Sequence, residues 1–146
     1  MKQLLPFRVG HENYGLELKD VQEIVEDAQI YPLPGTPADI AGAIAFHGRI
    51  VPVIDLPRLL NFPRGRIGRR LVVLTNVHGP MALGVDQVDV IIKADNFAGS
   101  SSQESSERRY VARVFICAGQ MTSLLDLQQL QSRVAELCIQ GATDAH

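Results

Sequence analysis

The stretch GRIVPVIDL, residues 48–56, decides the fold because it returns as GQMTSLLDL at residues 119–127. Each copy has a glycine, a mostly apolar run, Asp-Leu at the same distance from the glycine, and a further leucine three positions later. A glycine before an apolar run is typical of a turn that leads into a strand, and an aspartate is a good N-cap for a helix. The pattern therefore predicts that one strand and its short helix are used twice.

A second repeated segment precedes the first one in each half of the chain. LELKDVQEIV at residues 16–25 matches LGVDQVDVII at residues 83–92 without a gap. The matching apolar positions are Leu16, Leu18, Val21, Ile24 and Val25 in one segment and Leu83, Val85, Val88, Ile91 and Ile92 in the other. Chance similarity between two amphipathic segments is the alternative, but the same order in both halves favours a duplication. We therefore expect two small β-barrels, each of several short strands and each ending in an Asp-capped helix.

Four residues of the repeated stretches have structural roles in this prediction. Gly48, with His47, makes a tight hairpin turn. Pro52 indicates an edge or a bulge in the strand that follows, because proline cannot donate to a sheet ladder. Asp55 caps a short helix and Asp126 caps the last helix of the chain. One face of that last helix is apolar at helical spacing, through Leu127, Leu130, Val134 and Leu137.

The local structure of three other segments can also be predicted from the sequence. The spacing of the apolar residues in DVQEIVE, residues 20–26, is compatible with one helical turn or with a bulged strand. IYPLPGTP, residues 30–37, holds three prolines and a glycine and should lack regular structure. The serine-rich segment 95–109 should be an exposed, flexible loop.

The composition places no strong demand on function. The formal net charge of −2 creates no global field for nucleic acid or for an anionic membrane. Cys117 and Cys138 lie in apolar patterns, which predicts buried thiols in a reducing compartment. No stretch resembles a signal peptide or approaches the length of a bilayer span, so we expect a cytoplasmic protein without membrane insertion.

The sequence gives no support for catalysis, a cofactor or a metal site. None of the four histidines stands at zinc-ligand spacing from another ligand, and the nucleotide-binding and nucleophile motifs are missing. Four arginines in residues 64–70, from Arg64 to Arg70, would fit a nucleic-acid contact. The run lacks aromatic residues for base stacking, so a solvated loop is the favoured interpretation. A small molecule held between the barrels is a further alternative.

The order VQEIV, PLPGTP and IAGAIAFHGRIVPVIDL resembles the CheW family of chemosensory coupling proteins. The positions that carry the resemblance are Val21, Glu23, Ile24, Pro32, Pro34, Pro37, Gly42, Gly48, Pro52, Val53, Asp55 and Leu56. LGVDQV at residues 83–88 looks like the second signature of the family, and together these features span most of residues 4–130. The resemblance implies a mainly β fold of two intertwined five-stranded SH3-like β-barrels with short capping helices and a C-terminal helix. We expect a single domain over 1–146, with 17–84 as one barrel and 1–16 plus 85–137 as the other.

The resemblance also implies a function. Members of the family are non-enzymatic adaptors that link the cytoplasmic tips of chemoreceptors, the methyl-accepting chemotaxis proteins, to a CheA-type histidine kinase. Carried over by position, Val21, Glu23, Gly42 and His47 would lie in the groove that faces the receptor. A glycine in that groove would let a partner backbone approach closely.

His47 departs from the family pattern, which usually has arginine there. Arginine carries a permanent charge and five donors, and neutral histidine has neither. Strand alternation would aim the neighbouring Arg49 at the opposite face, so Arg49 would not replace it. The departure suggests a different receptor or a non-flagellar pathway, such as one for pili or surface sensing.

Overall fold

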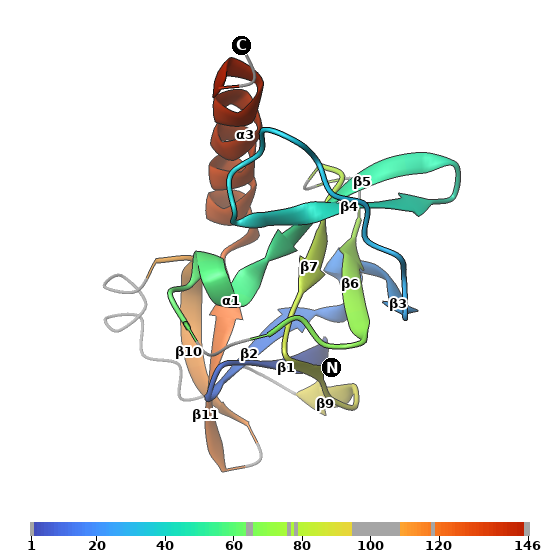
Figure 1. Ribbon diagram of the computed structural model, residues 1–146. Helices are drawn as coiled ribbons and strands as arrows, with labels where there is room; N and C mark the ends of the chain where they lie inside the picture. Colours follow the sequence, from blue (N-terminus) through green and yellow to red (C-terminus); the bar gives the residue numbers. More distant parts are fainter. Residues whose placement is uncertain are drawn as a thin grey trace.

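The computed structural model describes residues 2–63, 66–75, 77, 79–94, 109–117 and 119–144. The predicted flexible loop at 95–109 lies outside these residues apart from Arg109. The described chain forms two β-sheets with few helices, so the expected mainly β class is confirmed. The helices are the 3-10 turn η1 (Leu18–Asp20), α1 (Leu56–Leu59) and α3 (Leu127–Asp144). Figure 1 shows α3 running away from the sheets toward the C-terminus.

Each sheet combines segments that are far apart in the sequence. One sheet has the order β3-β6-β7-β5-β4, and the other has the order β10-β11-β2-β1-β8, with β9 also paired to β1. The strands of the first are β3 (Val21–Glu26), β4 (Ile40–Phe46), β5 (Arg49–Asp55), β6 (Arg70–Leu74) and β7 (Ala82–Gly84). Those of the second are β1 (Lys2–Val9), β2 (Glu12–Glu17), β8 (Gln87–Val88), β9 (Ile92–Ala94), β10 (Val111–Cys117) and β11 (Gln120–Leu125).

The strand registers confirm the duplication at the level of single residue pairs. Val25 faces Leu71 in the first sheet, and Ile92 faces Leu4 in the second. The positions 25 and 92, and likewise 4 and 71, are 67 apart. Sequence similarity over such a distance therefore corresponds to equivalent places in the two sheets.

The repeated hairpins also occupy equivalent places in the two sheets, and their equivalent residues are 71 positions apart in the sequence. The β4–β5 hairpin pairs in parallel with β7, and the β10–β11 hairpin pairs in parallel with β2. The register Val53–Ala82 in one sheet corresponds to Leu124–Gly15 in the other. Strand β2, with β1 next to it, pairs with the second hairpin, and β7, with β6 next to it, pairs with the first. The two units therefore exchange their first two strands. 

Two sheets are present, as the predicted pair of barrels requires, but closure and the number of five strands are not both confirmed. The pairings among the described residues leave both sheets open, and the second sheet has six strands rather than five. The extra strand arises because the segment that corresponds to β3 is divided into β8 and β9, between which Val90 and Ile91 are exposed. Of the two readings of residues 20–26, the bulged strand is confirmed, since the register of β3 shifts between Val21 and Glu23.

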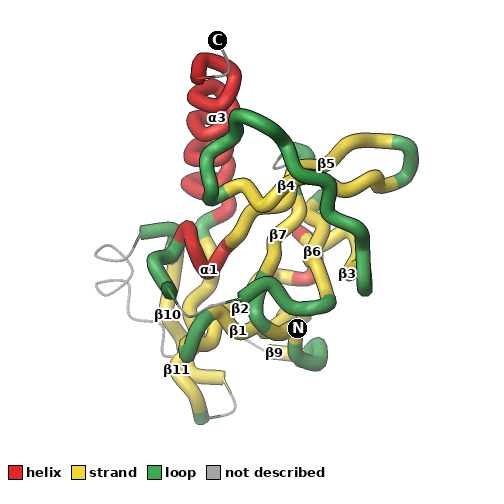
Figure 2. Tube along the Cα trace, viewed as in Figure 1, coloured by secondary structure: helices red, strands yellow, loops and turns green. Residues whose placement is uncertain are grey.

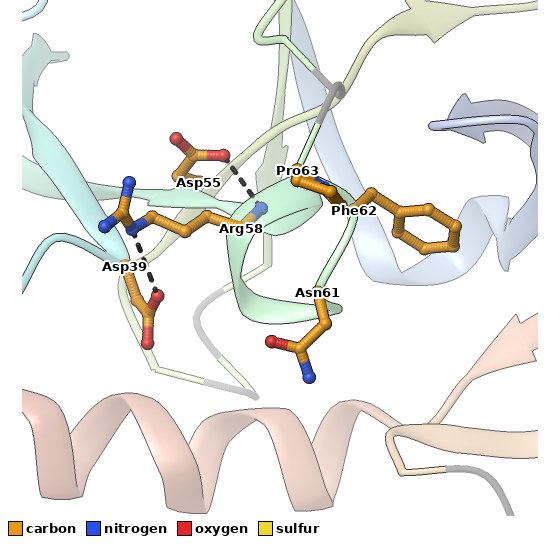
Figure 3. Close-up of a pocket in the computed structure, with 6 residues that line it drawn as sticks. All are labelled: Asp39, Asp55, Arg58, Asn61, Phe62 and Pro63. Carbon is orange, nitrogen blue, oxygen red and sulfur yellow. Dashed lines mark hydrogen bonds and ion pairs between the residues drawn. The ribbon is translucent and has the colours of Figure 1, made fainter.

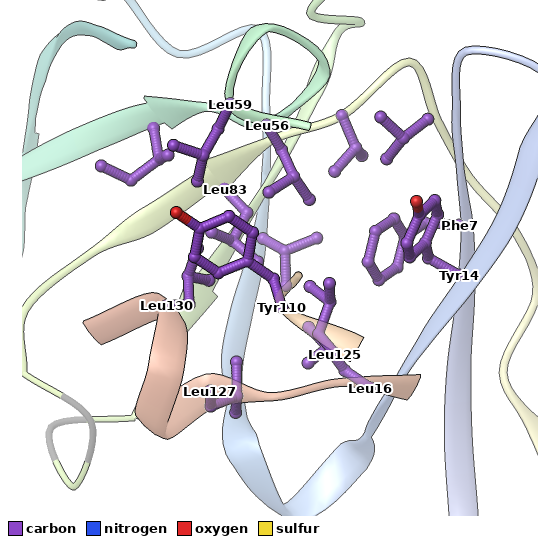
Figure 4. Close-up of a cluster of buried hydrophobic side chains, with 14 of the residues drawn as sticks. Phe7, Tyr14, Leu16, Leu56, Leu59, Leu83, Tyr110, Leu125, Leu127 and Leu130 are labelled. Atoms are coloured by element: carbon purple, nitrogen blue, oxygen red, sulfur yellow. The ribbon is translucent and has the colours of Figure 1, made fainter. Parts of the chain in front are cut away.

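The apolar core has three parts that follow the duplication. The main cluster contains side chains from both sheets and from both α-helices, with Phe7, Leu16 and Leu83 among those drawn in Figure 4. A smaller cluster around Ile44 and Val53 belongs to the first sheet, and another around Leu4 and Phe115 belongs to the second. Ile44 and Phe115 are 71 positions apart, so the two smaller clusters are counterparts. The main cluster is the part of the core that joins the two units.

The two predicted helix caps are confirmed, and the strand pairing shows how Pro52 is accommodated in β5. The backbone N–H of Arg58 donates to Asp55 at 3.1 Å, and that of Gln129 donates to Asp126 at 3.0 Å. Strand β5 is not an edge strand, because it lies between β7 and β4. Its pairing with β7 begins only at Val53, so Pro52 leaves no ladder bond unmade on that side.

The expected burial of both cysteines is wrong. Cys138 is exposed, and Cys117 is half-buried beside the Leu4–Phe115 cluster. Partial burial raises the pKa of the Cys117 thiol, because desolvation disfavours the thiolate. The apolar neighbours of Cys138 in the sequence were a poor guide, since a helix alternates its faces every few residues.

Candidate functional site

Two of the residues assigned to the receptor groove, Glu23 and His47, meet on the surface of the first sheet. The Nε2 atom of His47 lies 3.4 Å from Oε1 of Glu23, and both side chains are exposed. His47 and Gly48 form the two-residue turn between β4 and β5, with φ angles of 48° and 76°. Such left-handed pairs match the twist of a tight hairpin. The turn therefore holds His47 above β3.

A small hollow lies beside this pair, and we call it the hairpin groove. Its volume is about 60 Å³. It is lined by Gln22, Phe46, His47, Arg49, Val51, Val73, Leu74, Pro80 and Met81. The ring of His47 stands edge-on to that of Phe46, with centroids 4.2 Å apart. Apolar walls with a charged rim suit the side chain of a protein partner better than a polar metabolite.

Arg49 lies on the same side as His47, so the expectation that it would point to the opposite face is wrong. Both residues line the hairpin groove. Strand alternation does not continue across His47-Gly48, because the turn reverses the chain and Phe46 and Arg49 become cross-strand partners. The rim of the groove therefore carries an arginine as well as the histidine.

Gly42 and Val21 lie apart from the Glu23–His47 pair. Val21 is half-buried against the main core cluster. Gly42 is buried, and next to it Tyr31 and Ala43 exchange two backbone hydrogen bonds of 2.8 Å. A Cβ atom at Gly42 would overlap the Tyr31 carbonyl oxygen and would lie 2.7 Å from Cγ2 of Ile30. The backbone that approaches Gly42 is thus part of the same chain, the long loop between β3 and β4 in Figure 2.

Several groove residues were not identified from the sequence. Pro80 and Met81 precede β7, and Gln22 lies within the bulge of β3. No motif marks them, since they reach the groove through the pairing of β3, β6 and β7 rather than through local spacing. The sequence signal for the site was the family pattern at Glu23 and His47 alone.

A second hollow, of about 610 Å³, lies beside α1 (Figure 3). It is lined by Asp39, Asp55, Arg58, Asn61, Phe62 and Pro63. The Nε atom of Arg58 lies 3.9 Å from Oδ1 of Asp39, and the Arg58 backbone is held by Asp55. Burial raises the pKa of Asp55, although the hydrogen bond from the Arg58 backbone acts in the opposite direction. This hollow is where a small molecule could bind under the alternative interpretation, but Arg58 already lies near Asp39 and Asp55 already caps α1.

The last two arginines of the arginine-rich run, Arg69 and Arg70, lie beside carboxylates of the same chain. Arg69 donates to both carboxylate oxygens of Asp27, at 3.1 and 3.0 Å, and to Glu26 at 3.0 Å. The hydrogen bond from Arg69 lowers the pKa of Asp27. Arg70 lies 3.9 Å from Glu26. These pairs favour a structural role for Arg69 and Arg70 over a nucleic-acid contact, and Arg64 lies outside the described residues.

The described residues offer neither a metal site nor a membrane-spanning helix. They contain no group of three or more potential His, Cys, Asp or Glu ligands placed to hold a metal ion. No helix in the described part of the chain is long and apolar enough to cross a bilayer.

Comparison with known protein families gives one match over nearly the whole chain. The CheW-like domain family matches residues 3–135. Protein FrzA of Myxococcus xanthus is 37% identical over 79 residues, which are 54% of this chain and about half, 49%, of that protein. A probable chemotaxis protein CheW of Rhizobium etli is 26% identical over 136 residues, covering 90% of this chain and 88% of its own.

Among solved structures, the chain is similar to the scaffolding protein TtCheW from Thermoanaerobacter tengcongensis. The TM-score is 0.77 at 26% sequence identity. The superposition covers 86% of this chain and 88% of the other. The arrangement of the two sheets is therefore one that an experimentally determined scaffold protein shares.

Proposed function

The chain belongs to the CheW-like domain family, and we propose that it is a non-enzymatic adaptor that couples chemoreceptors to a CheA-type histidine kinase. The observation that carries the proposal is the family match over residues 3–135 together with the exposed Glu23–His47 pair. An adaptor needs one surface for each partner and no chemistry of its own. We place it in the cytoplasm, where receptor tips and the kinase would meet.

We propose the hairpin groove and the Glu23–His47 pair as the receptor-facing surface. A charged rim steers a partner and sets specificity, while apolar walls provide contact area. The buried position of Gly42 and the half-buried position of Val21 support structural roles, in which they shape β4 and β3 beneath that surface. 

We further propose that the two sheets form the two barrels of the family fold, over 17–84 and over 1–16 with 85–137. The separate clusters around Ile44 and around Leu4 support this division, because each barrel needs an interior of its own. The shared main cluster would then join the barrels into one folding unit.

Charge reversal at the proposed surface tests the receptor assignment. Glu23→Lys should weaken binding to the purified cytoplasmic fragment of a cognate receptor by about tenfold or more, because it replaces an attractive contact with a repulsive one. Glu136→Lys is the matched control, since it reverses an exposed charge on α3. Calorimetric titration measures both. Equal affinities for the two variants would contradict the assignment.

The identity of residue 47 tests the pathway hypothesis. We expect His47→Arg to lower the affinity for the cognate receptor by about tenfold, because arginine adds a permanent charge and a fixed fork of donors beside Glu23. The same titration measures this change, and a thermal melt shows whether the variant is folded. An unchanged affinity would remove the basis for a distinct receptor or a non-flagellar pathway.

A further inference from the structure

Strand pairing holds the side chain of Arg49 at the rim of the hairpin groove. Phe46 and Arg49 flank the His47-Gly48 turn and are cross-strand partners. Cross-strand partners project from the same face of a sheet. Phe46 is only 8% exposed and lines the groove, whereas Arg49 is exposed. The pairing therefore places a permanent cation beside an apolar wall, on a hairpin that projects from the body (Figure 1).

The Arg49 guanidinium is available to a partner. It forms no salt bridge or side-chain hydrogen bond among those found in the described residues. Arg69, by contrast, donates to both carboxylate oxygens of Asp27. The carboxylate of the site, Glu23, lies 3.4 Å from His47 instead. The surface around the groove therefore presents both signs of charge, and its positive charge comes from Arg49. 

The small volume of the hairpin groove gives the charges around it a large share in recognition. Its volume of about 60 Å³ is about twice the roughly 30 Å³ that one water molecule takes up in the liquid. The groove can therefore hold the end of one apolar side chain and not more. A single apolar contact would accept many partners, so discrimination among them depends on the charged surroundings.

We propose that Arg49 selects the receptor, by binding an acidic side chain on the receptor helix whose apolar residue enters the hairpin groove. The inference rests on the proposed adaptor function. Residues three or four positions apart share one face of a helix, so the helix that fits carries its acidic residue about one turn from the apolar one. A basic residue one turn in the other direction would meet Glu23.

The two charges also fix the direction in which such a helix lies. In the reversed direction the basic residue of the partner would meet Arg49 and its acidic residue would meet Glu23, and like charges in contact oppose binding. His47 cannot take the place of Arg49, because histidine lacks the permanent charge and the fork of five donors of arginine. Arg49 is therefore the specificity-determining residue of the groove.

Charge reversal with a matched control tests this assignment. Arg49→Glu should weaken binding to the purified cytoplasmic fragment of the cognate receptor by about tenfold or more, because it replaces an attractive contact with a repulsive one. Arg8→Glu should leave the affinity unchanged, since Arg8 is an exposed arginine of β1 in the other sheet and does not line the groove. Calorimetric titration measures both affinities, and a thermal melt shows whether each variant is folded.

The salt dependence of binding provides a second readout, which a purely structural role of Arg49 would not change. Added salt screens an exposed ion pair between the two proteins. The affinity of the native chain should therefore fall as the salt concentration rises from about 50 to about 300 mM, and Arg49→Ala should reduce this fall. Arg8→Ala should fall as the native chain does. An equal salt dependence in the Arg49 variant would overturn the inference.

Rescue by the partner separates a direct contact from an indirect effect. The acidic residues of the receptor fragment are changed to lysine one at a time. One of these changes should restore the affinity of the Arg49→Glu variant by about fivefold or more and should weaken binding of the native chain. If none of them does, or if Arg49→Glu binds as tightly as the native chain, the inference is wrong and the adaptor function stands. A native chain that does not bind the fragment at all would contradict the proposed function, and this inference with it.

Discussion

Gly42→Ala is expected to lower the free energy of unfolding by about 2–4 kcal/mol. The added Cβ would overlap the Tyr31 carbonyl and press on Ile30, and Gly42 has φ +148°, which L-residues rarely adopt. The strand and the loop cannot move apart without losing the two hydrogen bonds between Tyr31 and Ala43. Chemical denaturation of the variant and the native chain measures the difference.

Gly48→Ala is the matched control for this prediction. Gly48 also has a positive φ, +76°, but a Cβ there would have no atom within 4 Å. Gly48→Ala should lower the free energy of unfolding by only about 1–2 kcal/mol, because it imposes the cost of the left-handed backbone conformation without a steric overlap. Equal costs at both glycines would contradict the view that Gly42 is fixed by the chain's own loop. Because the Gly42→Ala substitution destabilises the fold, a loss of partner binding in this variant would not by itself place Gly42 in the binding surface.

Leu130→Ala is expected to destabilise the whole protein by about 2–5 kcal/mol, the range for a buried leucine. Leu130 is 0% exposed, and it packs in the main cluster, which contains residues of both sheets. Because that cluster joins the two units, both should unfold together. Urea denaturation followed by far-UV circular dichroism and by tyrosine fluorescence should show one coincident transition.

Gln128→Ala, an exposed position in the same helix, provides the comparison and should change stability by less than about 0.5 kcal/mol. Two separate transitions for the Leu130 variant would mean that the units have independent cores. A cost near that of the Gln128 variant would mean that α3 contributes little to the core.

The parts of the fold that follow from local signals could be predicted from the sequence. The hairpin at His47-Gly48 and the caps at Asp55 and Asp126 depend on neighbouring residues only. The duplication was also visible, because both units preserve the same apolar positions. Strand exchange and the number of strands depend on long-range pairing, which spacing does not encode.

The candidate site was predictable only in part, for a physical reason. A glycine can let the backbone of a partner or of its own chain approach closely, and the sequence does not distinguish the two cases. At Gly42 the approaching backbone belongs to the chain's own loop. A bulge shifts the spacing of the apolar residues in β3 toward that of a helix. The spacing of Val21 and Ile24 was therefore compatible with both a helical turn and a bulged strand. The position of Arg49 was missed because alternation stops at a turn.

If this chain bridges a receptor and a kinase, reconstitution from the purified components should show it. The purified chain, the CheA-type kinase of the same organism and the cytoplasmic fragment of its receptor would be combined on beads that carry the receptor. The kinase should be retained only when the chain is present, and Glu23→Lys should strongly reduce this retention. A kinase that displaces the chain from the receptor, or a chain that binds neither partner, would contradict the adaptor function.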